Sequence, residues 1–334
     1  MAGRNSYQAY RGKRSGGKRL LAGVLVLVIL AAVAVLLVQK YIVYDTTGEP
    51  RLEVPWKETE ETAEEPPVEL DLVIRPVEVP ASPHGWLLPA APLTAEDCRA
   101  ALAKNGSAVA VTVKDGNGTV YVPLPSVPET FVAPPEAEAL PLLLESACRP
   151  VARITCFRDG IAAAAYGDTA ALKTRGGALF RDGEGGAWLD PAKSAARDYL
   201  CTVAREAAEL GFREILLTDI TYPITGDLTG VAYGTGLRRD HLQTFLQEMR
   251  AALEPYGVTL SVELPAEVIL AGELPYSGQI LADIAPLVDR VYAQIAPEQA
   301  SACAAAVTAA AETAVFIPVL NGVEPAGDGE CLLQ

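Results

Sequence analysis

Histidine is scarce in this sequence, which has only two among its 334 residues. His84 lies in a proline-rich turn, and His241 lies in a helical pattern far along the chain. Serine and cysteine nucleophiles usually need a nearby histidine as their base. The sequence also has no Gly-x-Ser-x-Gly motif, which presents the nucleophilic serine in many hydrolases. We therefore do not expect a peptidase or another hydrolase with a serine or cysteine nucleophile.

Patterns that hold metals or phosphates are also missing. The six cysteines include no Cys-x-x-Cys pair, and their wide spacing argues against a zinc site. The glycine-rich sequence Gly234-Thr235-Gly236 lacks a third glycine and is more typical of a flexible loop before a helix than of a phosphate site. We expect no metal and no cofactor, and we do not expect a phosphatase.

The cysteines leave two states open. An even number of cysteines permits disulfides outside the cytoplasm. Cys156 and Cys201, however, fall within predicted core elements, and Cys303 falls within an alanine-rich helix. Such positions favour buried free thiols.

Positive charge is concentrated at the N-terminus. Residues 1–40 hold seven lysines and arginines and no acidic residue. Removing these seven charges from the net charge of −15 leaves −22 for residues 41–334. Nucleic acid is therefore not expected as a partner of the main body.

A long apolar run, residues 20–38, follows six of the seven bases. About 20 apolar residues in a helix span the hydrocarbon core of a bilayer. The run exceeds the apolar core of about 7–15 residues in a secretory signal peptide, so a retained transmembrane helix is favoured over a cleavable signal. The preceding bases leave the N-terminus in the cytoplasm by the positive-inside rule. We therefore predict a single-pass protein of the cell membrane whose main domain is extracytoplasmic.

After this run the composition changes to glutamate, threonine and proline, as in residues 57–70 (KETEETAEEPPVEL). Such a segment buries too little apolar surface to offset its conformational entropy. The predicted organisation is a basic cytoplasmic tail at 1–19, a transmembrane helix at 20–38, an acidic stalk at 39–69 and a barrel domain at 70–325.

Beyond the stalk, short apolar runs alternate with helical patterns, which is typical of β-α units. Several such units without a glycine-rich phosphate turn after the first strand favour a (β/α)8 TIM barrel over a doubly wound sheet. We predict strands at 85–88, 108–113, 151–157, 214–220, 259–263, 288–295 and 315–320, and helices at 94–104, 192–210, 238–256, 280–286 and 297–313. No eighth strand is apparent. We expect residues 70–77 to close the barrel, or the barrel to be incomplete.

The stretch 206–223 (EAAELGFREILLTDITYP) lies at the centre of this pattern. It reads as the end of a helix, a stop at Gly211 and a strand buried on both faces, with Thr218 and Asp219 near its carboxyl end. Three more carboxylates follow predicted strands, namely Asp115, Asp159 and Glu263. Converging carboxylates are what glycoside hydrolysis needs, although turns are also rich in aspartate.

Four motifs share the order and spacing of a known family. They are residues 113–118 (VKDGNG), 152–159 (ARITCFRD), 188–191 (WLDP) and the stretch 206–223. Over about residues 83–320 the chain resembles a bacterial family described as putative glycosyl hydrolases with a TIM-barrel fold. The resemblance implies that the partner is a polysaccharide or a peptidoglycan-type glycan.

The chain departs from the family pattern within the expected site. Thr218 stands where the family has aspartate, so that the carboxylate moves to Asp219, and Thr221 replaces an arginine. Glu263 replaces an aspartate, and residues 293–296 (AQIA) replace a Met-x-Tyr-Pro motif. Two hypotheses remain: an envelope-anchored glycoside hydrolase, and a catalytically inactive carbohydrate-binding or scaffold protein.

For an active enzyme, the expected catalytic pair is Asp219 and Glu263. The family motifs and the predicted strand ends supply the expected substrate-binding residues, which are Lys114, Asp115, Arg153, Asp159, Trp188, Asp190 and Tyr222. Aromatic residues make up only 6% of the chain, so few side chains can stack on sugar rings.

Overall fold

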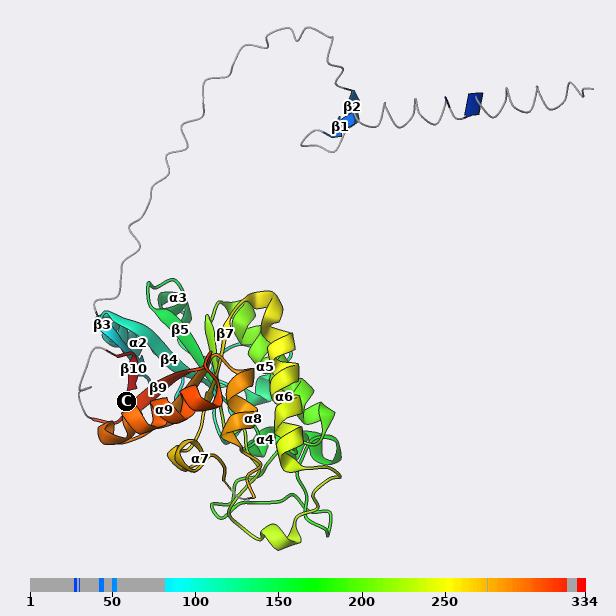
Figure 1. The fold of residues 1–334 in the computed structure, drawn as a ribbon, viewed down its shortest axis with the longest axis vertical. Coiled ribbons are helices and arrows are strands. Elements are labelled where there is room, and N and C mark those ends of the chain that lie inside the picture. Colours follow the sequence, from blue (N-terminus) through cyan, green and yellow to red (C-terminus); the bar gives the residue numbers. More distant parts are fainter. Residues whose placement is uncertain are drawn as a thin grey trace, which may run out of the picture. The chain divides into compact units, whose positions relative to one another are not determined.

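The structure, a computed structural model, describes residues 82–274, 276–322 and 329–334, together with residues 27–28, 30, 42–44 and 50–52 (Figure 1). The chain divides into two compact units, Met1–Arg75 and Pro76–Gln334. Most of the first unit lies outside the described residues, including the predicted tail at 1–19 and most of the predicted transmembrane helix and stalk.

The first unit contains one small element of sheet. Strand β1 (Ile42–Tyr44) pairs antiparallel with β2 (Pro50–Leu52). Leu27, Val28 and Leu30, within the predicted transmembrane helix, are helical and exposed. Across the described residues, no helix has both the length and the hydropathy needed to cross a membrane.

The second unit is a closed barrel of parallel strands with helices around it, which confirms the predicted (β/α)8 architecture (Figure 1). Its strands are β3 (Ser82–Leu87), β4 (Gly106–Lys114), β5 (Arg149–Thr155), β6 (Glu214–Thr218), β7 (Thr259–Glu263), β8 (Arg290–Gln294), β9 (Val315–Leu320) and β10 (Cys331–Leu333). Its helices are α2 (Ala95–Leu102), α3 (Ala139–Leu144), α4 (Gly160–Tyr166), α5 (Ser194–Leu210), α6 (Arg238–Leu253), α7 (Ala266–Ala271), α8 (Leu281–Ile284) and α9 (Ala300–Ala310). The strands neighbour one another in sequence order.

The eighth strand, β10, corrects the expectation for how the barrel closes. This C-terminal strand pairs in parallel with both β9 and β3, so the barrel is complete and does not need residues 70–77, which lie outside the described residues. Gly85 on β3 permits the close approach, because a Cβ there would lie 2.9 Å from Leu332 Cδ2. The barrel thus extends beyond residue 325, the predicted end of the domain.

The strands alternate between the barrel lumen and the surrounding helices. One cluster of buried side chains fills the lumen, and it comprises Ala108, Ala110, Val151, Leu216, Tyr292, Ile317, Val319 and Leu332. A larger cluster packs the outer faces of the strands against the helices. In β6, Leu216 lies in the lumen, so residues 214 and 218 face the same way at its two ends.

A polar network occupies the N-terminal end of the barrel. The fully buried carboxylate of Glu214 lies 2.8 Å from Arg149 Nε and accepts hydrogen bonds from Ser261 Oγ at 2.6 Å and Tyr292 Oη at 2.8 Å. Glu330, the residue before β10, forms ion pairs with Arg149 and Arg290. These contacts link the last strand to β5 and β8.

The stretch 206–223 folds as predicted up to Thr218, where β6 ends two residues before the predicted strand end at residue 220. Helix α5 ends at Leu210, and Gly211 follows with a left-handed φ of 113°. Strand β6 then runs to Thr218 with every residue buried. This geometry brings Thr218 and Asp219 to the C-terminal end of the barrel.

All six cysteines lie among the described residues, and each is a free thiol. Five are buried, including Cys156 and Cys303 as predicted, whereas Cys201, which was also predicted to lie in the core, is only partly buried. Burial raises the pKa of Cys98 to about 11, so this thiol stays protonated and unreactive at neutral pH.

Candidate functional site

A cavity of about 890 Å³ opens at the C-terminal ends of the barrel strands, where TIM-barrel enzymes have their active sites. Strands β5 to β9 and their loops supply nearly all of its wall. The polar side chains of that wall are Arg153, Thr155, Arg158, Thr218, Asp219, Thr221, Glu263, Glu267, Gln279, Gln294, Gln299 and Asn321. Among the described residues, no aromatic side chain lines this cavity.

Asp219 lies in the cavity because β6 ends one residue earlier. Its φ of 49° is in the left-handed region, which breaks the alternation of the strand and lets both Thr218 and Asp219 line the same cavity. Burial raises the pKa of Asp219, and the nearby Glu263 charge acts in the same direction. Arg153 and Arg158 oppose the shift without cancelling it. Asp219 is therefore suited to hold a proton at higher pH than an ordinary aspartate.

Glu263 ends β7, the strand beside β6. Leu217 pairs with Val262, so the ends of the two strands are adjacent. Glu263 Oε2 lies 3.1 Å from Arg153 Nε, and both side chains are partly exposed to the cavity. The predicted pair Asp219 and Glu263 and the predicted binding residue Arg153 are thus brought together in one cavity.

Thr218 occupies the position where the family keeps aspartate. Its hydroxyl donates to Thr155 Oγ1 at 3.2 Å, across the β5–β6 pair. The side chain faces the lumen and is 5% exposed. This position therefore presents a hydroxyl to the cavity in place of a carboxylate.

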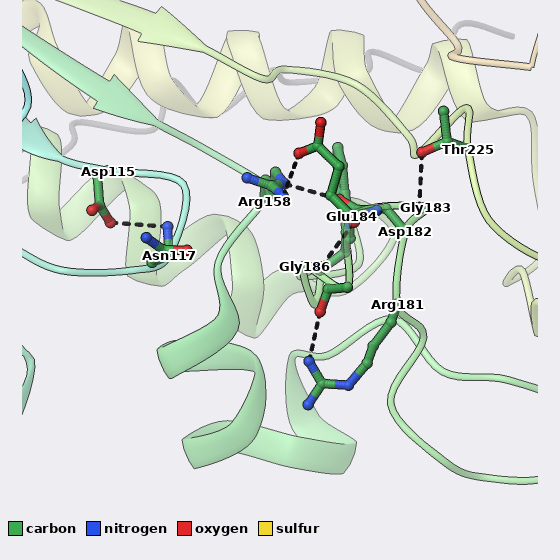
Figure 2. A network of polar contacts seen from close by, with 11 residues as sticks. Asp115, Asn117, Arg158, Arg181, Asp182, Gly183, Glu184, Gly186 and Thr225 are labelled. Atoms are coloured by element: carbon green, nitrogen blue, oxygen red, sulfur yellow. Dashed lines mark hydrogen bonds and ion pairs between the residues drawn. The ribbon is translucent and has the colours of Figure 1, made fainter.

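Arg158 connects the cavity to a loop between α4 and α5 (Figure 2). Its Nε donates to Asp182 Oδ2 at 2.9 Å, and Nη2 donates to Glu184 Oε2 at 3.0 Å. Asp182 Oδ1 also accepts from the backbone amides of Glu184 and Gly186. Burial alone would raise the pKa of Asp182, but the hydrogen bonds from Arg158 and Trp188 lower it overall. The loop therefore holds the Arg158 guanidinium at the cavity wall.

Two predicted binding residues, Lys114 and Asp159, are fully buried beside the cavity and do not line it. Lys114 Nζ lies 2.8 Å from Asp159 Oδ2 and donates to the backbone oxygen of Thr155 at 2.5 Å. Asp159 also caps α4, since its Oδ1 accepts from Ala162 N at 2.7 Å. The polar atoms of both side chains are therefore bonded to other residues of the fold.

Asp115 and Trp188 are also bonded within loops away from the cavity wall. Asp115 Oδ1 accepts from the backbone amide of Asn117 (Figure 2). It also accepts from the amides of Gly118 and Thr119, and Asp115 Oδ2 accepts from Tyr121 Oη. Trp188 is 6% exposed and donates Nε1 to Asp182 Oδ2 at 2.9 Å. Neither side chain lines the cavity.

Asp190 and Tyr222 lie further along the same rim, again outside the cavity wall. Asp190 Oδ1 accepts from Ala192 N at 3.0 Å, and burial raises its pKa. Tyr222 is 1% exposed, and its hydroxyl is 2.7 Å from His241 Nδ1. These residues fix loops behind the cavity.

The cavity also contains residues that the sequence did not single out. Arg158 lies in the 152–159 motif, one residue before Asp159. Its position as a cation directly after a predicted strand is a signal from which it could have been predicted as a site residue. Gln279 and Asn321 come from segments without any motif, and Gln294 comes from residues 293–296, which stand in place of the family's Met-x-Tyr-Pro motif. Throughout the described residues, no group of histidine, cysteine, aspartate and glutamate is arranged to hold a metal ion.

Solved structures of several barrel proteins are similar to this chain. A hypothetical protein from Ruminiclostridium thermocellum is 23% identical, with a TM-score of 0.45 over 53% of this chain and 96% of that one. The PgaB (BpsB) glycoside hydrolase domain from Bordetella bronchiseptica is 16% identical, with a TM-score of 0.46 over 64% and 74%. A GH20 exo-β-N-acetylglucosaminidase from Vibrio harveyi is 13% identical, with a TM-score of 0.49 over 73% and 41%.

The comparison with protein families gives a clearer result than the comparison with solved structures. None of the curated proteins matches the chain. The profile of a family described as "Putative glycosyl hydrolase domain" matches residues 99–313, which include β4 to β8 and the cavity residues from Arg153 to Gln299. Because this match covers well over half of the chain, the protein belongs to the putative glycosyl hydrolase domain family.

Proposed function

We propose that this protein is a glycoside hydrolase anchored in the cell membrane, with its barrel outside the cytoplasm and a cell-envelope glycan as its substrate. The observation that carries the proposal is the position of Asp219, a partly buried carboxyl with a raised pKa, beside Glu263 in the cavity at the strand ends. Two carboxyl groups in unlike surroundings can divide the roles of acid and base.

In the proposed reaction, Asp219 is the general acid. Its raised pKa favours the protonated form, which donates the proton to the glycosidic oxygen as the bond from that oxygen to the anomeric carbon breaks. Glu263 is ion-paired with Arg153 and supplies the carboxylate. This carboxylate either attacks the anomeric carbon or removes a proton from the attacking water.

The other polar groups of the cavity suit a hydroxyl-rich substrate. Gln279, Gln294 and Asn321 each offer both a hydrogen-bond donor and an acceptor. Arg158 adds a fixed cation to the wall that also contains Asp219. A glycan can therefore be oriented by several hydrogen bonds, although it finds no stacking surface in the described wall.

The proposed location rests on the sequence. The apolar run at 20–38 is long enough to span a bilayer, and six bases precede it. An anchored barrel outside the cytoplasm would meet polysaccharide or peptidoglycan-type glycans directly.

The test compares wild type with Asp219→Asn on aryl glycosides and cell-wall polysaccharides. Asp219→Asn should lower the rate by at least about 100-fold, because it removes the general acid, and should leave the melting temperature nearly unchanged. Thr221→Ser, a conservative change at the same rim, is the matched control. Wild-type turnover that survives Asp219→Asn would overturn the assignment of the acid.

A second candidate, a glycan-binding protein without turnover, is favoured by one observation. Thr218 holds the lumen-facing position of the family's aspartate, and its hydroxyl is bonded to Thr155. If wild type binds envelope glycans but does not cleave them, Thr218→Asp should restore some turnover by returning a carboxylate to that position. Absence of both binding and turnover in all variants would leave a structural role in the envelope.

A further inference from the structure

A second cavity, of about 410 Å³, lies between the start of α6 and the loop joining α7 to α8. Its wall includes Arg238 and Tyr276, and Gln279 lines both this pocket and the main cavity. We propose that this pocket binds a carboxylate-bearing sugar of the same glycan chain that enters the main cavity. The inference rests on the proposed function, because it adds to the proposed glycan substrate a neighbouring sugar that carries a negative charge.

Tyr276 gives the pocket an aromatic surface that the main cavity lacks. It is 72% exposed, and its φ of 68° is a left-handed conformation that residues other than glycine rarely adopt. The loop is held in place, since Tyr222 N donates to Ser277 O at 2.8 Å and a Cβ on Gly278 would lie 2.9 Å from Arg238 Cβ. A tyrosine ring held outward on a fixed loop is suited to stack on the apolar face of a pyranose.

Arg238 supplies the charge that would select an acidic sugar. Its guanidinium lies 3.9 Å from the centroid of the Tyr233 ring and donates to the backbone oxygen of Tyr276. Within the described part of the chain it has no acidic partner, whereas its neighbour Arg239 pairs with Asp283 at 2.8 Å. Arginine binds carboxylates through two parallel hydrogen bonds, so Arg238 retains this capacity. Glu273 lies in the same wall but is exposed, where solvent screens its charge.

Gln279 joins the two binding places. The residue is 2% exposed and faces both cavities. Its side-chain amide makes no hydrogen bond to any other described residue. The amide atoms are not among the buried side-chain atoms without a partner, so they are open to the cavities. A sugar hydroxyl or acetamido group offers both a donor and an acceptor to this amide.

The test uses the full chain in detergent and two probes, the disaccharide of N-acetylglucosamine with N-acetylmuramic acid and the methyl ester of that disaccharide. Titration calorimetry should give a wild-type affinity about 10-fold higher for the acid, because the ester cannot pair with a guanidinium. Arg238→Gln should abolish this preference. Tyr276→Ala should weaken the binding of both probes. Arg250→Gln, the matched control, should change neither affinity, because Arg250 lies on the same helix and lines neither cavity.

Each result decides the inference separately from the proposed function. Three results would contradict the acidic subsite: equal wild-type affinity for acid and ester, a preference that persists in Arg238→Gln, or no binding of either probe. Glu263→Gln should retain the ratio between acid and ester, because Glu263 lies only in the main cavity. If hydrolysis depends on Asp219 but wild type shows no preference for the acid, the proposed function would be supported and the acidic subsite would be contradicted.

Discussion

Lys114 Nζ lies 2.8 Å from Asp159 Oδ2, and neither side chain is exposed to solvent. The pair joins the end of β4 to the start of α4, beside the cavity. A buried charge that loses its partner is strongly destabilising, whereas the complete pair contributes little beyond an apolar replacement. The pair therefore makes the loops around the cavity sensitive to single substitutions.

Lys114→Met should lower the free energy of unfolding by about 3–5 kcal/mol, because the Asp159 carboxylate remains buried without its cation. Asp159→Asn should also destabilise, although asparagine can still cap α4. The double variant should be more stable than the sum of the two losses predicts. Urea unfolding followed by circular dichroism measures all three, and simple additivity would show that the two side chains are not coupled.

Glu330 should make the barrel sensitive to acid. Burial alone would raise the pKa of Glu330, but Arg149 and Arg290 lower it overall from its ordinary value of about 4.5. The resulting stabilisation is fully present above pH 4.5 and is lost as the pH falls through the lowered pKa of the folded state. Thermal unfolding from pH 7 to 3 should show this loss in wild type. Glu330→Gln should have a lower melting temperature at neutral pH and a flatter profile below pH 4.5, and two parallel profiles would contradict the assignment.

Asp219 should set the alkaline limit of any glycoside hydrolysis. A general acid must be protonated, so turnover should fall as the pH rises through the raised pKa of Asp219. Arg158 opposes this rise, and Arg158→Gln should therefore move the alkaline limb of kcat/KM to higher pH. Arg175→Gln changes an exposed arginine and serves as the control. A limb that moves to lower pH would show that another group is the acid.

Gly186 should be intolerant of a side chain. A Cβ there would lie 2.8 Å from Arg158 Nε, so Gly186→Ala must displace the guanidinium from Asp182. Overpacking of this kind typically costs about 1–3 kcal/mol in the free energy of unfolding. Gly176→Ala is the control, because its nearest contact would be an ordinary 3.8 Å. Equal stability of the two variants would mean that Arg158 moves aside freely.

Protease added to intact protoplasts should remove the barrel domain and leave the N-terminus protected. The reason is the apolar run at 20–38 with the bases before it. An epitope at each end of the chain distinguishes the two orientations. Cleavage at the N-terminus with a protected barrel would reverse the proposed topology.

Most of the barrel could be predicted from the sequence, because each of its longer strands is a run of apolar residues bounded by turns. Strand β10 could not, since three residues, Cys331–Leu333, are too short a pattern to separate from a loop. Their pairing with β3 depends on contacts between distant parts of the chain. Propensity carries no information about such contacts.

The candidate site was predictable only where the strand ends define it. Asp219, Glu263 and Arg153 follow or end strands, and the barrel geometry alone brings them together. Trp188 and Tyr222 also occur in or beside family motifs, but their polar atoms are bonded to Asp182 and His241 and their rings are buried. Sequence pattern does not distinguish an aromatic ring that packs inside a loop from one that faces a ligand.

The pairing of β10 with β3 also determines when the domain can finish folding. Cys331 aligns with His84, about 250 residues earlier, so the barrel cannot close until residues 331–333 have left the ribosome. Until then β3 and β9 are unpaired edges, which invite association between chains. A domain exported through a membrane as an extended chain would complete this closure only on the far side, after its last strand has crossed.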